Sequence, residues 1–117
     1  MTVNPITLEV VRNSLVAYSE EMATALCKSA YNMMIYEVRD FCCGIIDTQG
    51  RMVSQNSGGL PIFLADLGTA VLDGIERYGL DGFDPGDVVI MNHAETCGQH
   101  LNNMVVYSPC FVGGKLV

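Results

Sequence analysis

The two histidines of the sequence, His93 and His100, lie in one polar stretch that runs from residue 92 to residue 103. Glu95, Cys97 and three asparagines lie in the same stretch. Imidazole, carboxylate and thiolate groups bind metal ions and move protons, so these residues indicate a candidate metal or catalytic site. Two arguments weigh against it. The histidine spacing of seven residues matches no standard zinc motif, and Asn, Gly and His are common in turns without a chemical role.

Two short apolar runs, 88–91 and 104–107, flank this polar loop and predict strands. Gly98, inside the loop, allows a sharp turn or the close approach of a bound group. We therefore expect the loop to connect two strands and to present its polar groups at their ends.

A second polar group, Glu37 with Arg39 and Asp40, lies in the segment 31–40, which has no clear period. In an extended segment Glu37 and Arg39 would point to the same side. This pattern is typical of a surface ion pair, which contributes little to stability. The alternative is a carboxylate directed into a site with Arg39 beside it.

The composition narrows the class of protein. The chain has 117 residues, half of them apolar, which suits one domain of ordinary size. Its net charge of −7 comes from 13 acidic and 6 basic residues and argues against nucleic-acid binding. Neither a signal peptide nor an apolar run long enough to span a membrane is visible in the sequence.

The cysteines indicate a reducing environment. There are five, two of them adjacent as Cys42 and Cys43, and no Cys-x-x-Cys occurs. An odd number with an adjacent pair does not suit a disulfide framework. We interpret them as reduced thiols of a cytoplasmic protein, mostly small core residues, with Cys97 set apart by its place in the polar loop.

The apolar periodicity predicts an α+β fold. One helix is expected from about residue 7 to 30, with Thr7 as its N-cap, and a second from about 64 to 78. A hairpin is expected between strands at 41–46 and 51–55, and further strands flank the polar loop. The first helix carries a stripe that little else in so short a chain could cover, which favours docking outside the chain. The stripe is formed by Leu8, Val11, Leu15, Tyr18, Met22 and Ala25.

The last three residues, 115–117, begin an apolar strand directly after the turn at Gly113-Gly114. From this we expect residues 1–117 to be the N-terminal portion of a longer polypeptide, or a small subunit that pairs with a larger one.

Several dispersed motifs, in this order, resemble the start of the hydantoinase B and oxoprolinase family. They are Asn-Pro-Ile-Thr-Leu-Glu-Val-Val-Arg-Asn at 4–13, Glu-Val-Arg-Asp-Phe at 37–41, Ile-Ile-Asp-Thr-Gln-Gly-Arg-Met-Val-Ser-Gln at 45–55, Pro-Gly-Asp-Val-Val-Ile-Met-Asn at 85–92 and Gly-Gln-His-Leu-Asn-Asn at 98–103.

The resemblance implies a two-part enzyme. An ATP-binding, hydantoinase A-like partner would phosphorylate a cyclic amide such as a hydantoin, an oxoproline or a lactam. The hydantoinase B part would complete ring opening at a metal-assisted site. A related branch, similar to acetone and acetophenone carboxylases, implies carboxylation of a ketone instead. The third alternative is a non-catalytic subunit whose first helix docks on a partner.

The resemblance also implies metal ligands. His100 matches the histidine of the family's Gly-Thr-His-Leu-Pro-Asp motif, and Glu37 and Asp40 match the acidic residues of its Glu-Arg-x-Asp segment. Imidazole and carboxylate would suit manganese, zinc or iron.

This sequence departs from the family pattern at several ligand positions. Asn103 stands in place of an aspartate, Phe63 in place of a histidine, and His93 in place of the aspartate of Asn-Asp-Pro. Gln99 and Asn102 replace a threonine and a proline. Either His93 has taken over a ligand position in a rebuilt site, or the metal has been lost. We favour the rebuilt site, because loss would not predict a new histidine in the same loop. The isolated chain is expected to be inactive, since it has no Walker-type motif to supply phosphorylation.

Overall fold

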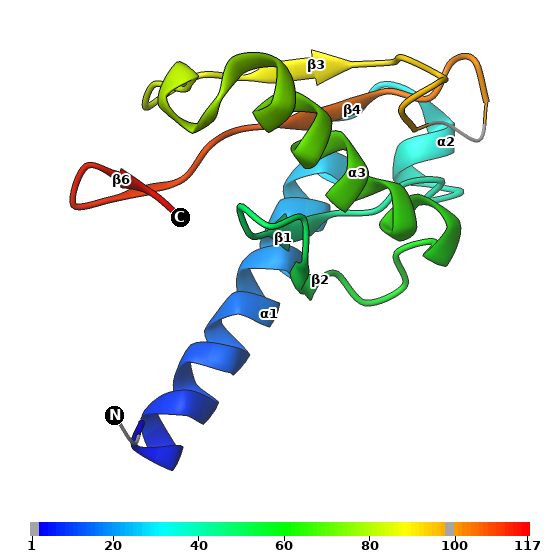
Figure 1. Ribbon diagram of the computed structural model, residues 1–117. Helices are drawn as coiled ribbons and strands as arrows, with labels where there is room; N and C mark the ends of the chain where they lie inside the picture. Colours follow the sequence, from blue (N-terminus) through cyan, green and yellow to red (C-terminus); the bar gives the residue numbers. More distant parts are fainter. Residues whose placement is uncertain (1–2, 98–99) are drawn as a thin grey trace. The chain divides into compact units, whose positions relative to one another are not determined.

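The computed structural model describes residues 3–97 and 100–117. The expectations placed on Gly98 and Gln99 lie outside these residues. The described chain combines helices with short strand pairs, and this confirms the α+β class and the expected order of a long helix, a hairpin, a second long helix and further strands (Figure 1). It divides into two compact units, residues 1–45 with 53–60 and residues 46–52 with 61–117.

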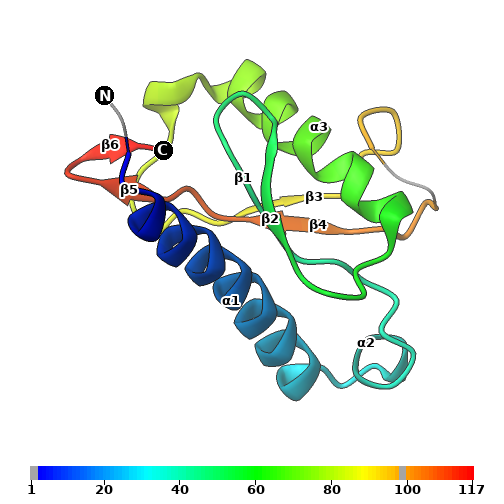
Figure 2. The same ribbon diagram turned by 90° about the horizontal axis from the view of Figure 1, so that it is seen from below.

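The first unit is built on α1 (Pro5–Ser29), one long helix in both views (Figure 2). Its N-cap is Asn4, so the expectation of Thr7 was wrong. The Asn4 side chain accepts a hydrogen bond from the Ile6 N–H at 2.9 Å. Pro5 follows at the first helical position, where the missing N–H costs no helical hydrogen bond. Because of Asn4 and Pro5, helix α1 begins earlier than the apolar period alone indicates.

The apolar stripe of α1 is largely exposed, and the buried residues of this helix are Ser19 and Ala23. Tyr18 is 58% exposed and Leu8 55%. The small residues beside the stripe, rather than the stripe itself, therefore form the contact of α1 within its unit. Ser19 donates a hydrogen bond to Ser54 Oγ at 2.9 Å, which links α1 to the hairpin.

The segment that follows α1 contains one helical turn, α2 (Met33–Tyr36), rather than an extended stretch. Asn32 caps this turn by accepting from the Met34 N–H at 2.9 Å, and Glu37 ends it. A helix of four residues is too short to show a helical repeat of apolar residues, so the sequence did not predict it. After the turn, Arg39 has a positive φ of 60°.

The predicted hairpin is present as β1 (Gly44–Ile46) and β2 (Met52–Gln55). Asp47 holds its turn by accepting hydrogen bonds from the backbone N–H groups of Gln49 and Arg51, each at 2.9 Å. The base of the hairpin belongs to the first unit and its tip, residues 46–52, to the second.

The second unit packs α3 (Pro61–Tyr78) against the antiparallel pair β3 (Val89–Met91) and β4 (Val105–Tyr107), as Figure 1 shows. The helix begins at Pro61, three residues before the predicted start. The strand register pairs Val89 with Tyr107 and Met91 with Val105. The two central residues of the strands are exposed, Ile90 at 64% and Val106 at 57%.

Two glycines set the distance at which α3 meets its neighbours. A Cβ at Gly74 would lie 1.8 Å from Tyr107 Oη, and a Cβ at Gly68 would lie 2.2 Å from the Gly50 carbonyl oxygen. Strand β4 and the tip of the hairpin can therefore approach α3 closely only where it has no side chain.

Beyond α3, Leu80–Gly82 form one 3-10 turn (η1), and Phe83 packs edge-on against Tyr78 with ring centroids 5.9 Å apart. The described chain ends in a small hairpin, β5 (Phe111–Val112) with β6 (Lys115–Leu116), joined by two glycines as predicted. In the part of the chain that the structure covers, no helix is both long and apolar enough to cross a bilayer.

Candidate functional site

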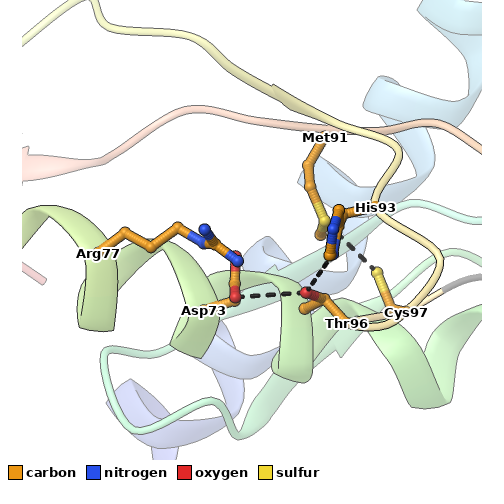
Figure 3. Close-up of polar contacts among 6 residues, drawn as sticks. All are labelled: Asp73, Arg77, Met91, His93, Thr96 and Cys97. Atoms are coloured by element: carbon orange, nitrogen blue, oxygen red, sulfur yellow. Dashed lines mark hydrogen bonds and ion pairs between the residues drawn. The ribbon is translucent and has the colours of Figure 1, made fainter.

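The polar loop leaves β3 and turns back at once. The His93 carbonyl oxygen accepts hydrogen bonds from the backbone N–H groups of Thr96 at 3.1 Å and Cys97 at 3.2 Å. This turn brings the Thr96 hydroxyl and the His93 ring to the same side of the loop (Figure 3). Strand β3 and its register with β4 therefore fix where the imidazole is presented.

A chain of polar contacts connects that imidazole to α3 (Figure 3). Thr96 Oγ1 donates to Asp73 Oδ1 at 3.3 Å and lies 3.4 Å from His93 Nδ1. Asp73 Oδ2 in turn accepts from Arg77 Nε at 2.7 Å. Helix α3 supplies Asp73 and Arg77 one turn apart, and the loop supplies Thr96 and His93.

The proton arrangement in this chain follows from its donors. A hydroxyl has one proton, and here Thr96 donates it to the carboxylate. The neutral His93 tautomer with its proton on Nδ1 is the one that satisfies both contacts, and in this tautomer Nε2 has a free lone pair. An imidazole held in this tautomer is suited to bind a metal ion or to accept a proton through Nε2.

Asp73 is the electrostatic centre of the site. The hydrogen bond from Arg77 lowers the pKa of this carboxyl below its usual value, and the Arg77 charge, Thr96 and His93 act in the same direction, against partial burial. The same ion pair raises the pKa of Arg77. Asp73 is therefore ionised at neutral pH and remains an acceptor for Thr96.

The His93 ring lies at a shallow cavity of about 230 Å³ formed within the second unit. A drug-sized pocket starts at about 300 Å³, so this cavity suits a small group. Burial, with Asp73 and Tyr78 nearby, raises the pKa of the Tyr107 phenol, which stays protonated as a donor. The cavity is lined by Asp73, Gly74, Arg77, Tyr78, Val89, Ile90, Met91, Asn92, His93 and Tyr107.

Cys97 is a packing residue. It is 8% exposed, and its sulfur lies 4.0 Å from the Met91 sulfur. Burial, with Asp66 and Asp73 nearby, raises the pKa of the thiol. A thiolate is the form that binds metals or attacks substrates, so Cys97 is poorly suited to either role at neutral pH.

The residues expected to bind a metal fall into both units. Glu37 and Asp40 follow α2 in the first unit, Glu37 exposed and Asp40 half-buried, while His93 and His100 are exposed in the second. The His100 carbonyl oxygen accepts a hydrogen bond from the Asn103 N–H at 3.1 Å. Within residues 3–97 and 100–117, no three His, Cys, Asp or Glu side chains gather closely enough to hold one metal ion.

Sequence reasoning did not single out Asp73 and Thr96. Asp73 lies 20 residues before His93, and only the packing of α3 on the strands joins them. One sequence signal existed. Ala70 and Gly74, four residues apart, mark the side of α3 that comes closest to its neighbours, and both are buried. Asp73 lies beside that small-residue face.

The charge of Asp73 predicts a pH-dependent contribution to stability. Its folded-state pKa lies below the unfolded value of about 3.9, so the contribution is present above that pH and is lost as pH falls through the lowered pKa. Asp73→Asn is expected to lower the thermal midpoint by roughly 2 °C at pH 7. The difference from wild type should shrink below about pH 4. Thermal unfolding from pH 7 to pH 3 measures it, with Asp81→Asn as a control of equal charge change. A difference that persists undiminished at pH 3 would contradict the assignment.

The profile of the family described as Hydantoinase B/oxoprolinase matches residues 4–117. The chain therefore belongs to this family, as its motifs indicated. No solved structure matches it.

Curated relatives align with almost the whole chain. A 5-oxoprolinase of Pestalotiopsis fici is 31% identical over 97% of this chain and 9% of its own length. The caprolactamase subunit beta of Pseudomonas jessenii is 32% identical over 99% of this chain and 20% of its own length. The 5-oxoprolinase of Saccharomyces cerevisiae is 29% identical over 100% of this chain and 9% of its own length. The chain thus spans between 9% and 20% of these relatives.

Proposed function

We propose that this chain is part of the metal-site subunit of an ATP-dependent enzyme that opens a cyclic amide after a partner subunit has phosphorylated it. The observation that carries the proposal is the family match over residues 4–117. Relatives named 5-oxoprolinase and caprolactamase support a ring amide as the substrate class. The name "subunit beta" of one relative supports a multi-subunit enzyme. The partner would be an ATP-binding, hydantoinase A-like subunit.

The proposed metal ligands are His100, Glu37, His93 and Asp40, with manganese, zinc or iron as the metal. Neutral imidazoles and carboxylates are the donor types these ions accept. The contacts around His93 support its part in this set, because they favour the tautomer whose Nε2 lone pair is free to bind a metal ion. A bound metal would polarise the amide carbonyl and activate water.

The residues around His93 have positioning tasks in this proposal. Arg77 keeps Asp73 ionised, so Asp73 continues to accept the Thr96 proton. Thr96 then fixes the tautomer and the direction of the His93 ring. Because these contacts join helix α3 to the loop after β3, the imidazole is oriented before any ligand binds.

The function is tested on the native protein purified with whatever ATPase accompanies it. ATP turnover should rise several-fold with a hydantoin, 5-oxoproline or a lactam, and the ring-opened acid should accumulate. Stimulation by ketones with bicarbonate instead would replace the proposal with the carboxylase alternative. Stimulation by neither class would favour a non-catalytic subunit.

A further inference from the structure

The first unit contains a cavity of its own, which shares no lining residue with the cavity at His93. Its volume is about 320 Å³, within the range of small-ligand pockets. Helix α1 forms one wall, and the segments around residues 39–41 and 56–58 form the others. Its lining residues are Glu20, Ala23, Thr24, Cys27, Lys28, Arg39, Phe41, Asn56, Ser57 and Gly58.

Two cationic side chains at this cavity, Lys28 and Arg39, have no acidic partner in the described part of the chain. The three ion pairs found there are formed by Arg12, Arg51 and Arg77 instead. The chain has only 6 basic residues and a net charge of −7, so two unpaired cations at one cavity differ from the acidic character of the chain as a whole. They form a local site of positive charge, which attracts an anion.

Arg39 reaches this cavity from a strained backbone conformation. Among the non-glycine residues of segments 3–97 and 100–117, Arg39 is the one with a positive φ, which is 60°. Such a conformation is unfavourable for a residue with a Cβ and persists only where the surroundings impose it. Here the Asp40 N–H donates to the Met34 carbonyl at 2.8 Å, and the Phe41 N–H donates to the Arg39 carbonyl at 2.9 Å. Both hydrogen bonds constrain the backbone directly after Arg39.

The opposite charge in the cavity is fixed as well. Glu20 Oε1 accepts a hydrogen bond from the Ser57 N–H. That loop is anchored by Asn56, 5% exposed, whose Oδ1 accepts from the Cys43 N–H at 2.8 Å. A carboxylate held by one oxygen keeps its second oxygen as an acceptor for an N–H group.

We propose that this cavity binds a small oxyanion that also carries an N–H group. Lys28 and Arg39 would bind the carboxylate or phosphoryl oxygens, and Glu20 would accept the N–H. The inference rests on the proposed function only for its choice of probe, a cyclic amide with an acid group. The site itself stands on the charges and contacts of the first unit.

The test is an NMR titration of the 117-residue chain at constant ionic strength with three probes. 5-Oxoproline has both an acid group and a ring N–H, 2-pyrrolidone has the N–H alone, and inorganic phosphate has the anionic charge alone. Saturable binding of 5-oxoproline is expected, with shifts at the Lys28, Ser57 and Gly58 amides. Phosphate should shift the same amides, and 2-pyrrolidone should bind at least tenfold more weakly than 5-oxoproline.

Matched variants separate the charge from the backbone. Arg39→Gly removes the guanidinium while a positive φ remains easy for glycine, and at least a fivefold loss of affinity for both anions is expected. Arg12→Gln removes one positive charge from a residue of α1 that does not line the cavity, and it should change affinity little. Equal affinities of these two variants, or no saturable binding to the wild type, would overturn the proposal.

Glu20→Gln keeps an oxygen for the Ser57 N–H and removes the negative charge. It should weaken 5-oxoproline binding at least twofold relative to phosphate binding. An unchanged ratio would overturn the role given to Glu20. Because binding is measured without ATP or turnover, its failure is distinct from failure of the proposed enzyme activity.

Discussion

Gly68→Ala is expected to destabilise the second unit by about 2 kcal/mol, although alanine favours helices. In an exposed helix the substitution stabilises by about 1 kcal/mol. At Gly68 the new Cβ would lie 2.2 Å from the Gly50 carbonyl oxygen, a backbone atom that cannot rotate away. Overpacking of this kind costs up to about 3 kcal/mol, so the clash exceeds the gain in helix propensity. Urea unfolding of the chain measures the difference.

Thr69→Ala is the matched control, because Thr69 is the next residue of α3 and is exposed. It should stabilise by a few tenths of a kcal/mol through helix propensity alone. If Gly68→Ala were as stable as the wild type or more so, the hairpin tip would not pack on α3 at this position. The sign of the effect therefore tests the close approach directly.

The close packing of the hairpin tip on α3 is a feature of the fold that the sequence did not predict. The apolar periods located α1, α3 and the strands, because each of these elements has a repeating apolar pattern in its local sequence, even where that face is exposed, as in α1. The helix starts were placed two or three residues late, since Asn4, Pro5 and Pro61 act through capping and backbone chemistry rather than through apolar spacing. The turn α2 was missed because four residues carry no period.

The candidate site divides in the same way. The sequence indicated the loop and its histidine, since both are local. It could not indicate the hydrogen bond between Asp73 on α3 and Thr96 in the loop after β3. That contact depends on how closely α3 packs at its small residues Ala70 and Gly74. Cys97 was set apart from the core cysteines by its place in the polar loop, but it is buried, and the loop sequence alone does not indicate this packing. The joint role of His93, His100, Glu37 and Asp40 stays a prediction.

Thr96→Val is expected to weaken metal binding by at least about tenfold in the native protein. Valine keeps the branched shape of threonine but removes the hydroxyl through which Asp73 orients His93. Loss of a group that orients a metal-binding histidine typically costs 10- to 100-fold in metal affinity, as an order of magnitude. Equilibrium dialysis with manganese, zinc and iron in turn measures this effect without depending on turnover.

Thr96→Ser separates the hydroxyl from the shape of the side chain. Serine restores the donor to Asp73 and the acceptor for His93, so its metal affinity should lie within about threefold of the wild type. His93→Ala with His100→Ala sets the lower limit, because it removes two proposed ligands. Equal metal content in this double variant and the wild type would rule out a metal at the polar loop. Equal affinities of Thr96→Val and Thr96→Ser, with metal lost only in the double variant, would instead remove Thr96 and Asp73 from the site. Metal binding would then depend on His93 and His100 without the support from α3.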